Sequence, residues 1–177
     1  MATTTFGSCY SGIGGADIGL IGCGWTLAFQ AESDPFRRQI LQARFGVQIA
    51  EDVAIVRPPG DYDVLYADLP DPRLESWWPP LAQILRMAPP RRAVIVECSP
   101  SVQCESIIRD IVLLPGSWMF RLMHVTSCIQ LAQTAAEDVD VRKRAVIVAS
   151  PDVAIDLGLD AMAVEIAISD LVTTYPR

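Results

Sequence analysis

The feature that most constrains the fold is a glycine turn between a strand-like segment and a helix-like segment near the N-terminus. Thr3–Tyr10 has the composition of a β-strand, Gly12–Gly15 follows as a turn, and Ala16–Cys23 has helical spacing. Glycines let the backbone approach a ligand closely, and a helix N-terminus offers N–H groups with partial positive charge. The pattern indicates a loop that holds a polar or anionic cofactor, although a glycine loop by itself is also found as a simple tight turn.

An acidic residue stands where such a loop needs one. Thr26–Ala31 predicts a second strand, and Glu32 follows it directly. A carboxylate at the end of this strand can accept hydrogen bonds from ribose hydroxyls. The alternative is a solvated acid near a helix start, since Asp34 as N-cap and Pro35 in the first turn predict a helix that runs to about Phe45.

The rest of the chain alternates short apolar runs with helical patterns, which is typical of a parallel sheet with crossover helices. Ala93–Val96, bounded by Pro90 and Pro100, predicts a central strand that is covered on both faces. The other predicted strands are Val47–Ile49, Asp63–Tyr66, Met119–Ser127 and Ala145–Ala149, and the other helices are Trp77–Met87, Gln103–Leu113 and Asp160–Leu171. We therefore expect one α/β domain over residues 1–177, with a doubly wound, mostly parallel sheet.

Composition narrows the function classes. The formal net charge is −7 and the arginines are spread along the chain, so nucleic acid would be bound weakly, if at all, by this chain alone. The five cysteines include no CxxC pair, which favours buried, reduced thiols over a zinc site, and no metal is expected. No apolar run is long enough to span a membrane. We expect a soluble, cytoplasmic protein.

Six segments resemble, in order, the motifs of cytosine-C5 DNA methyltransferases. The glycine turn, Tyr10-Ser11-Gly12-Ile13-Gly14-Gly15, resembles the family's F-S-G-I-G-G motif. The other five segments are Gln30–Pro35, Glu51–Val53, Asp63–Pro70, Val94–Glu97 and Arg142–Ala149. The resemblance is strongest over residues 3–150 and implies the Rossmann-like fold of S-adenosylmethionine-dependent methyltransferases.

The resemblance also implies a cofactor, S-adenosyl-L-methionine or its product S-adenosylhomocysteine. Glu32 would hold the adenosyl ribose, and Asp52 would meet the adenine amino group. The cofactor-binding residues that it implies are Tyr10, Ser11, Gly12, Ile13, Gly14, Gly15, Glu32, Ser33, Asp52, Val53, Leu69 and Pro70.

The chain departs from the family at the catalytic residue. The family's P-C-Q motif supplies a cysteine that attacks C6 of cytosine and so activates C5. Asp71 stands at that position, and a carboxylate is a much poorer nucleophile than a thiolate. Glu97 and Arg142, which the resemblance implies would hold the flipped base, are both present. Standard C5 methylation is therefore not expected.

Cys98 offers an alternative nucleophile. It replaces the Asn of the family's E-N-V motif, and in the related RNA m5C methyltransferases the catalytic cysteine ends this same strand. The surrounding Glu97-Cys98-Ser99-Pro100, however, matches the DNA family better. Cys98 is therefore interpreted either as a relocated nucleophile or as a small substitute for Asn.

Three hypotheses of function follow. The first is a catalytically degenerate, cofactor-binding domain that acts as a regulatory or architectural subunit, covered by a protein partner or by self-association. About 27 residues follow the last clear strand, too few for the family's DNA-recognition domain and final helix, which is why a partner is expected. The second is an active methyltransferase of altered chemistry that uses Cys98. The third is a scaffold that no longer binds cofactor.

Overall fold

The computed structural model describes residues 3–47, 49–70, 74–99, 104–115, 118–130 and 139–151. Residues 74–75, 104, 119–130 and 139–144 are described as backbone only. The predicted helix Asp160–Leu171 and the residue Asp71 lie outside the described residues. Within the described part of the chain, no helix is both long and apolar enough to cross a membrane.

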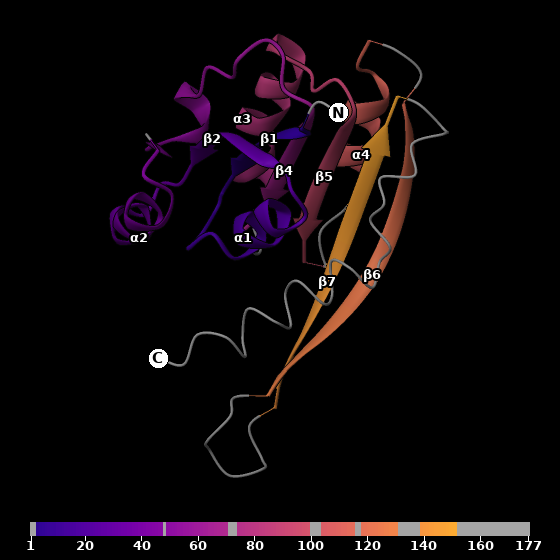
Figure 1. Cartoon of the computed structure of the whole chain (residues 1–177). Coiled ribbons are helices and arrows are strands. Elements are labelled where there is room, and N and C mark those ends of the chain that lie inside the picture. The colour runs from indigo at the N-terminus through magenta and orange to yellow at the C-terminus, as the bar shows by residue number, and fades with distance from the viewer. Residues whose placement is uncertain are drawn as a thin grey trace.

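Seven strands form one sheet in the order β3-β2-β1-β4-β5-β7-β6 (Figure 1). The strands are β1 (Thr5–Cys9), β2 (Thr26–Ala31), β3 (Ile49–Ala50), β4 (Val64–Asp68), β5 (Ala93–Cys98), β6 (Met119–Gln130) and β7 (Val139–Ser150). The first five pair in parallel, and β7 is antiparallel to both of its neighbours. This arrangement confirms the expected doubly wound, mostly parallel α/β fold.

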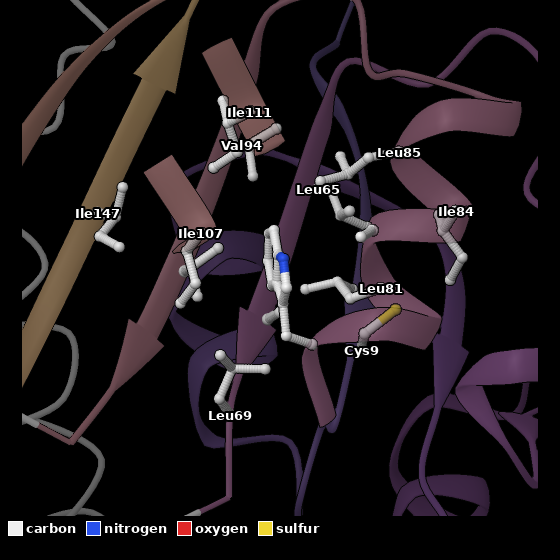
Figure 2. Close-up of a cluster of buried hydrophobic side chains, with 14 of the residues drawn as sticks. Cys9, Leu65, Leu69, Leu81, Ile84, Leu85, Val94, Ile107, Ile111 and Ile147 are labelled. Atoms are coloured by element: carbon white, nitrogen blue, oxygen red, sulfur yellow. The ribbon is translucent and has the colours of Figure 1, made fainter. Parts of the chain in front are cut away.

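Helices cover both faces of the sheet. They are α1 (Gly15–Gly22), α2 (Pro35–Phe45), α3 (Leu74–Met87) and α4 (Cys104–Val112), with a short 3-10 turn η1 (Val53–Ile55). Alternation along β4 and β5 sends Leu65 and Val94 into the cluster under α3 and α4, which Figure 2 shows. Their neighbours Val64 and Ala93 enter the smaller cluster under α1. β5 is therefore buried on both faces, as the continuous apolar run predicted.

Local signals explain where the helices begin and end. Helix α2 matches its predicted bounds because the Asp34 side chain accepts a hydrogen bond from the Arg37 N–H at 2.9 Å and Gly46 ends the helix in the left-handed conformation. Helix α3 begins three residues before the predicted start, at Leu74, so that Pro79 and Pro80 lie inside it. Trp78 anchors α3, since its ring is buried in the core and its Nε1 donates to Asp110 of α4 at 2.8 Å.

The last two strands are longer than the sequence indicated. β6 and β7 pair without interruption from Met119–Ser150 to Gln130–Val139. β5 pairs with β7 only over Ala145–Ala149, so the far half of the hairpin extends past the carboxyl end of β5 (Figure 1).

A buried carboxylate ties β1 to β4 at the amino edge of the sheet. Asp63 Oδ2 accepts hydrogen bonds from the Thr5 N–H at 2.8 Å and the Thr5 hydroxyl at 3.1 Å, and Oδ1 lies 3.0 Å from Arg91 Nη2. Burial alone would raise the pKa of Asp63, but the Thr5 hydrogen bonds and the Arg91 charge outweigh it and hold the pKa below its ordinary value.

We expect Asp63→Asn to lower the free energy of unfolding at pH 7 by about 1–3 kcal/mol. Because the folded state favours the ionised form, the stabilisation is present above the unfolded pKa of about 4 and is lost as pH falls through the lower folded pKa. Urea unfolding at pH 7 measures the loss of stability in the variant. The same measurement below pH 3 shows whether the difference between wild type and variant disappears. The exposed Asp61 is the matched control, and Asp61→Asn should stay within about 0.5 kcal/mol. Equal effects of the two variants would contradict this account.

Candidate functional site

The glycine turn lies at the carboxyl edge of β1 and is held from several sides. The Ser11 N–H donates to the Ala31 carbonyl at 3.2 Å, and the Gly14 N–H donates to the Ser11 carbonyl at 2.9 Å. Gly14 has φ +84°, and a Cβ there would lie 2.5 Å from the ring of Phe45. Arg44 donates to the Ile13 carbonyl at 2.8 Å, so α2 supports the turn both by packing and by hydrogen bonding.

Glu32 is the main support of this turn. Its Oε2 accepts a hydrogen bond from the Gly12 N–H at 2.8 Å, and its Oε1 accepts one from the Asp34 N–H at 2.9 Å. The side chain is only 4% exposed. The carboxylate that was predicted to hold a ribose therefore already fixes two backbone segments, the glycine turn at Gly12 and the N-cap of α2 at Asp34. Each oxygen uses one of its two acceptor positions in this way.

Two glycines of the turn face open space. A Cβ at Gly12 or Gly15 would have no heavy atom of the described chain within 4 Å. At Gly12 the positive φ of +58° explains the glycine. Gly15 has no positive φ, and it is the exposed first residue of α1. Neither conformation nor packing therefore requires glycine at position 15, and the backbone there is open to close approach by a ligand.

Tyr10 closes one side of the turn. It adopts a left-handed φ of 57°, which is uncommon for a residue with a side chain. Its hydroxyl donates to the Trp77 carbonyl at 2.6 Å, and the two rings make an edge contact. Burial raises the pKa of Tyr10, with smaller contributions from Cys9 and Asp52, so the hydroxyl remains a donor. The contact joins the glycine turn to the first turns of α3.

The residues expected near the adenosyl group lie beside this turn. Asp52 is exposed, and its side chain caps η1 by accepting a hydrogen bond from the Ala54 N–H at 2.9 Å. Val53 is buried. Ser33 is exposed, and its carbonyl accepts from Arg38 at 2.5 Å. Ser33 follows β2, which pairs with β1, and Asp52 and Val53 follow β3, which pairs with β2.

The carboxyl ends of β4 and β5 form the second part of the site. Asp68 pairs with Glu97 across the two strands, and the Leu69 N–H donates to the Glu97 carbonyl at 2.8 Å. The Tyr66 hydroxyl donates to Glu97 Oε2 at 2.9 Å. Burial, followed by the charges of Glu97 and Asp68, raises the pKa of Tyr66. Pro70 ends this described segment. Tyr66 holds Glu97 in place and was not predicted from the sequence. The available signal was its position on β4, two residues before Asp68 and therefore on the same face as the residue that pairs with Glu97.

Cys98 and Arg142 are placed differently from Glu97. Cys98 is 0% exposed and belongs to the apolar cluster under α3 and α4, whereas Glu97 contacts Tyr66, which belongs to the α1 face. The Arg142 backbone lies in β7 opposite Ser127, beyond the part of β7 that pairs with β5. Within the described residues, no group of three or more histidine, cysteine or acidic side chains could hold a metal ion.

A buried polar group beneath the turn was also not predicted. Asp17 of α1 accepts a hydrogen bond from Gln30 Nε2 at 2.8 Å, and the Ser8 and Ser11 hydroxyls lie 2.9 Å apart. Asp17 Oδ1 and Gln30 Oε1 are buried with no hydrogen-bond partner among the described residues. Burial raises the pKa of Asp17, and hydrogen bonds from Ser8 and Gln30 only partly oppose it. Burial therefore shifts the balance toward the neutral acid.

We expect Asp17→Asn to keep or increase stability at neutral pH, because an amide can donate to Gln30 Oε1 and accept from Gln30 Nε2. The wild-type free energy of unfolding should fall as pH rises from about 4, where the unfolded carboxyl ionises, up to the raised folded pKa. The variant should lack this fall. Asp34→Asn, at an exposed cap where both residues serve equally, is the control. A loss of more than about 1 kcal/mol in Asp17→Asn at pH 7 would contradict a net cost of burying the Asp17 charge.

No protein-family model and no curated protein sequence matches the chain. Solved structures do match. DNMT2 of Spodoptera frugiperda matches with a TM-score of 0.60 and 12% identity, covering 86% of this chain and 51% of that one. Dnmt2 methyltransferase of S. pombe matches with a TM-score of 0.58 and 14% identity, covering 83% and 49%. The chain thus spans about half the length of these proteins.

A third match comes from a different branch of methyltransferase chemistry. Precorrin-6y C5,15-methyltransferase of Geobacter metallireducens matches with a TM-score of 0.59 and 8% identity, covering 86% of this chain and 82% of that one. The three matches together show that the chain has a methyltransferase fold. At these identities they show the fold alone, so the function must be argued from the site.

Proposed function

We propose that this chain is a cytosine-C5 methyltransferase-like domain that binds S-adenosylmethionine but does not perform the family's cysteine-dependent methyl transfer. It would then act as a regulatory or architectural subunit. The observation that carries the proposal is the open backbone at Gly12 and Gly15, which lies at the N-terminus of α1 and is held through the Gly12 N–H by Glu32 at the end of β2.

The residues present fit the cofactor. The backbone at Gly12 and Gly15 would lie against it, at the N-terminus of α1, where N–H groups favour polar ligands. Glu32 would hold the ribose through the acceptor positions that its two backbone hydrogen bonds leave, and the exposed Asp52 would meet the adenine. The bound cofactor would supply an electrophilic methyl group.

The residues at the carboxyl ends of β4 and β5 support the absence of the family's cysteine-dependent methyl transfer. Asp71 stands where the family's nucleophilic cysteine is expected. A domain that only binds the cofactor requires no nucleophile at this position. Cys98, the alternative nucleophile, is enclosed by apolar side chains on the face of the sheet opposite Glu97. A thiol there would have to leave the core to reach a base held by Glu97.

We expect Gly15→Ala to weaken binding of S-adenosylmethionine and S-adenosylhomocysteine at least tenfold, or about 1.4 kcal/mol, in a calorimetric titration. Its added methyl group would occupy the space into which the ligand fits. Gly22→Ala is the matched control, because Gly22 is also exposed, ends the same helix and has nothing within 4 Å of its Cβ position in the described chain. Neither change should lower stability. Equal affinities of the two variants, or no binding by the wild type, would contradict the proposal.

We expect no transfer of labelled methyl from S-adenosylmethionine to DNA, RNA or free nucleotides, since the described side chains place no exposed thiol beside Glu97. A scintillation assay with an active C5 methyltransferase as positive control measures this. Transfer that is abolished in Cys98→Ala would overturn the proposal and establish the active-enzyme hypothesis instead.

A further inference from the structure

β6 is an unusually long edge strand. It ends the seven-stranded sheet and, among the described strands, pairs only with β7. It has 12 residues, about twice the common length of five to six. The outer row of backbone N–H and C=O groups on such a strand is a template for another strand.

The sequence of β6 lacks the usual protection of an edge. Proteins commonly block edge strands with charged residues, proline or a bulge. β6 contains one charged residue, Arg121, and neither proline nor glycine, and its register with β7 is continuous. The charged residues of the hairpin are concentrated on the inner strand, at Asp140 and Arg142–Arg144. This distribution is the reverse of the one that prevents edge pairing.

The outer half of the hairpin also needs support. The part of β7 that precedes Ala145 does not pair with β5. Among the described residues, Val139–Arg144 pair only with Val125–Gln130 of β6. Figure 1 shows this two-stranded ribbon extending past the rest of the sheet. A two-stranded hairpin is marginally stable by itself in water, and further strands stabilise it.

From these observations we infer that β6 pairs antiparallel with β6 of a second copy of this chain, about a two-fold axis near His124 and Val125. A two-fold axis lets one surface serve both partners. In this register Arg121 lies opposite Cys128, so the strand opposes no like charges. In each copy Val125–Gln130 of the ribbon then gains Met119–His124 of the other copy as a third strand, and the two sheets become continuous. The net charge of −7 disfavours a nucleic acid as the occupant.

We expect sedimentation equilibrium of the full chain to give twice the monomer mass at roughly 10–100 µM. The double variant Thr126→Glu/Ser127→Glu places four glutamates around the axis and should raise the dissociation constant at least about tenfold, while within its own hairpin each glutamate stands opposite Lys143 or Arg142 of β7. Gln39→Glu/Gln42→Glu adds the same charge at exposed positions of α2 and should leave the dimer intact. Circular dichroism checks that both variants fold.

Hydrogen exchange locates the interface independently. Backbone amides of β6 should exchange more slowly above the dissociation constant than below it, while those of α2 should not change. A wild-type monomer throughout this range, or a dimer that the β6 glutamates leave unchanged, would overturn the inference. These outcomes are independent of cofactor binding, so they leave the proposed function to its own tests.

Discussion

The N-terminal half of the site depends on the two hydrogen bonds of one buried carboxylate. Glu32 binds the Gly12 N–H with one oxygen and the Asp34 N–H with the other, so it fixes the glycine turn and the approach to α2 together. Loss of the carboxylate would leave two backbone donors without their partner. The turn therefore requires Glu32 whether or not a cofactor binds. The glutamate alone is therefore weaker support for a cofactor than its combination with the open backbone at Gly12 and Gly15.

At the carboxyl end of β5, the polar and the thiol side chains lie on opposite faces of the sheet. Alternation along β5 places Glu97 with Tyr66 and Cys98 in the core under α3 and α4. The two residues are neighbours in sequence but cannot serve one site without rearrangement of the strand end. Together with Asp71 at the family's nucleophile position, this geometry supports the proposal of a cofactor-binding domain that does not perform the family's reaction.

The sequence predicted elements well where local chemistry determines them. β2 and α2 match their expected bounds because Asp34, Pro35 and Gly46 mark the start and end of the helix unambiguously. Contacts that depend on strand register were not predictable. Tyr66 meets Glu97 only because β4 and β5 pair in the observed register. The predicted strands ended at Ser127 and began at Ala145, yet Cys128–Gln130 and Val139–Arg144 extend the ladder because it needs only backbone groups.

The central claim is that the glycine turn remains a cofactor cradle in a domain without the family's nucleophile. Amide NMR spectra recorded during titration with S-adenosylhomocysteine test it most directly. The account predicts saturable shifts at Gly12–Gly15, Glu32 and Asp52, with Gly22 and the amino edge around Asp63 unchanged. No shifts at millimolar ligand, or shifts confined to residues away from the turn, would contradict it.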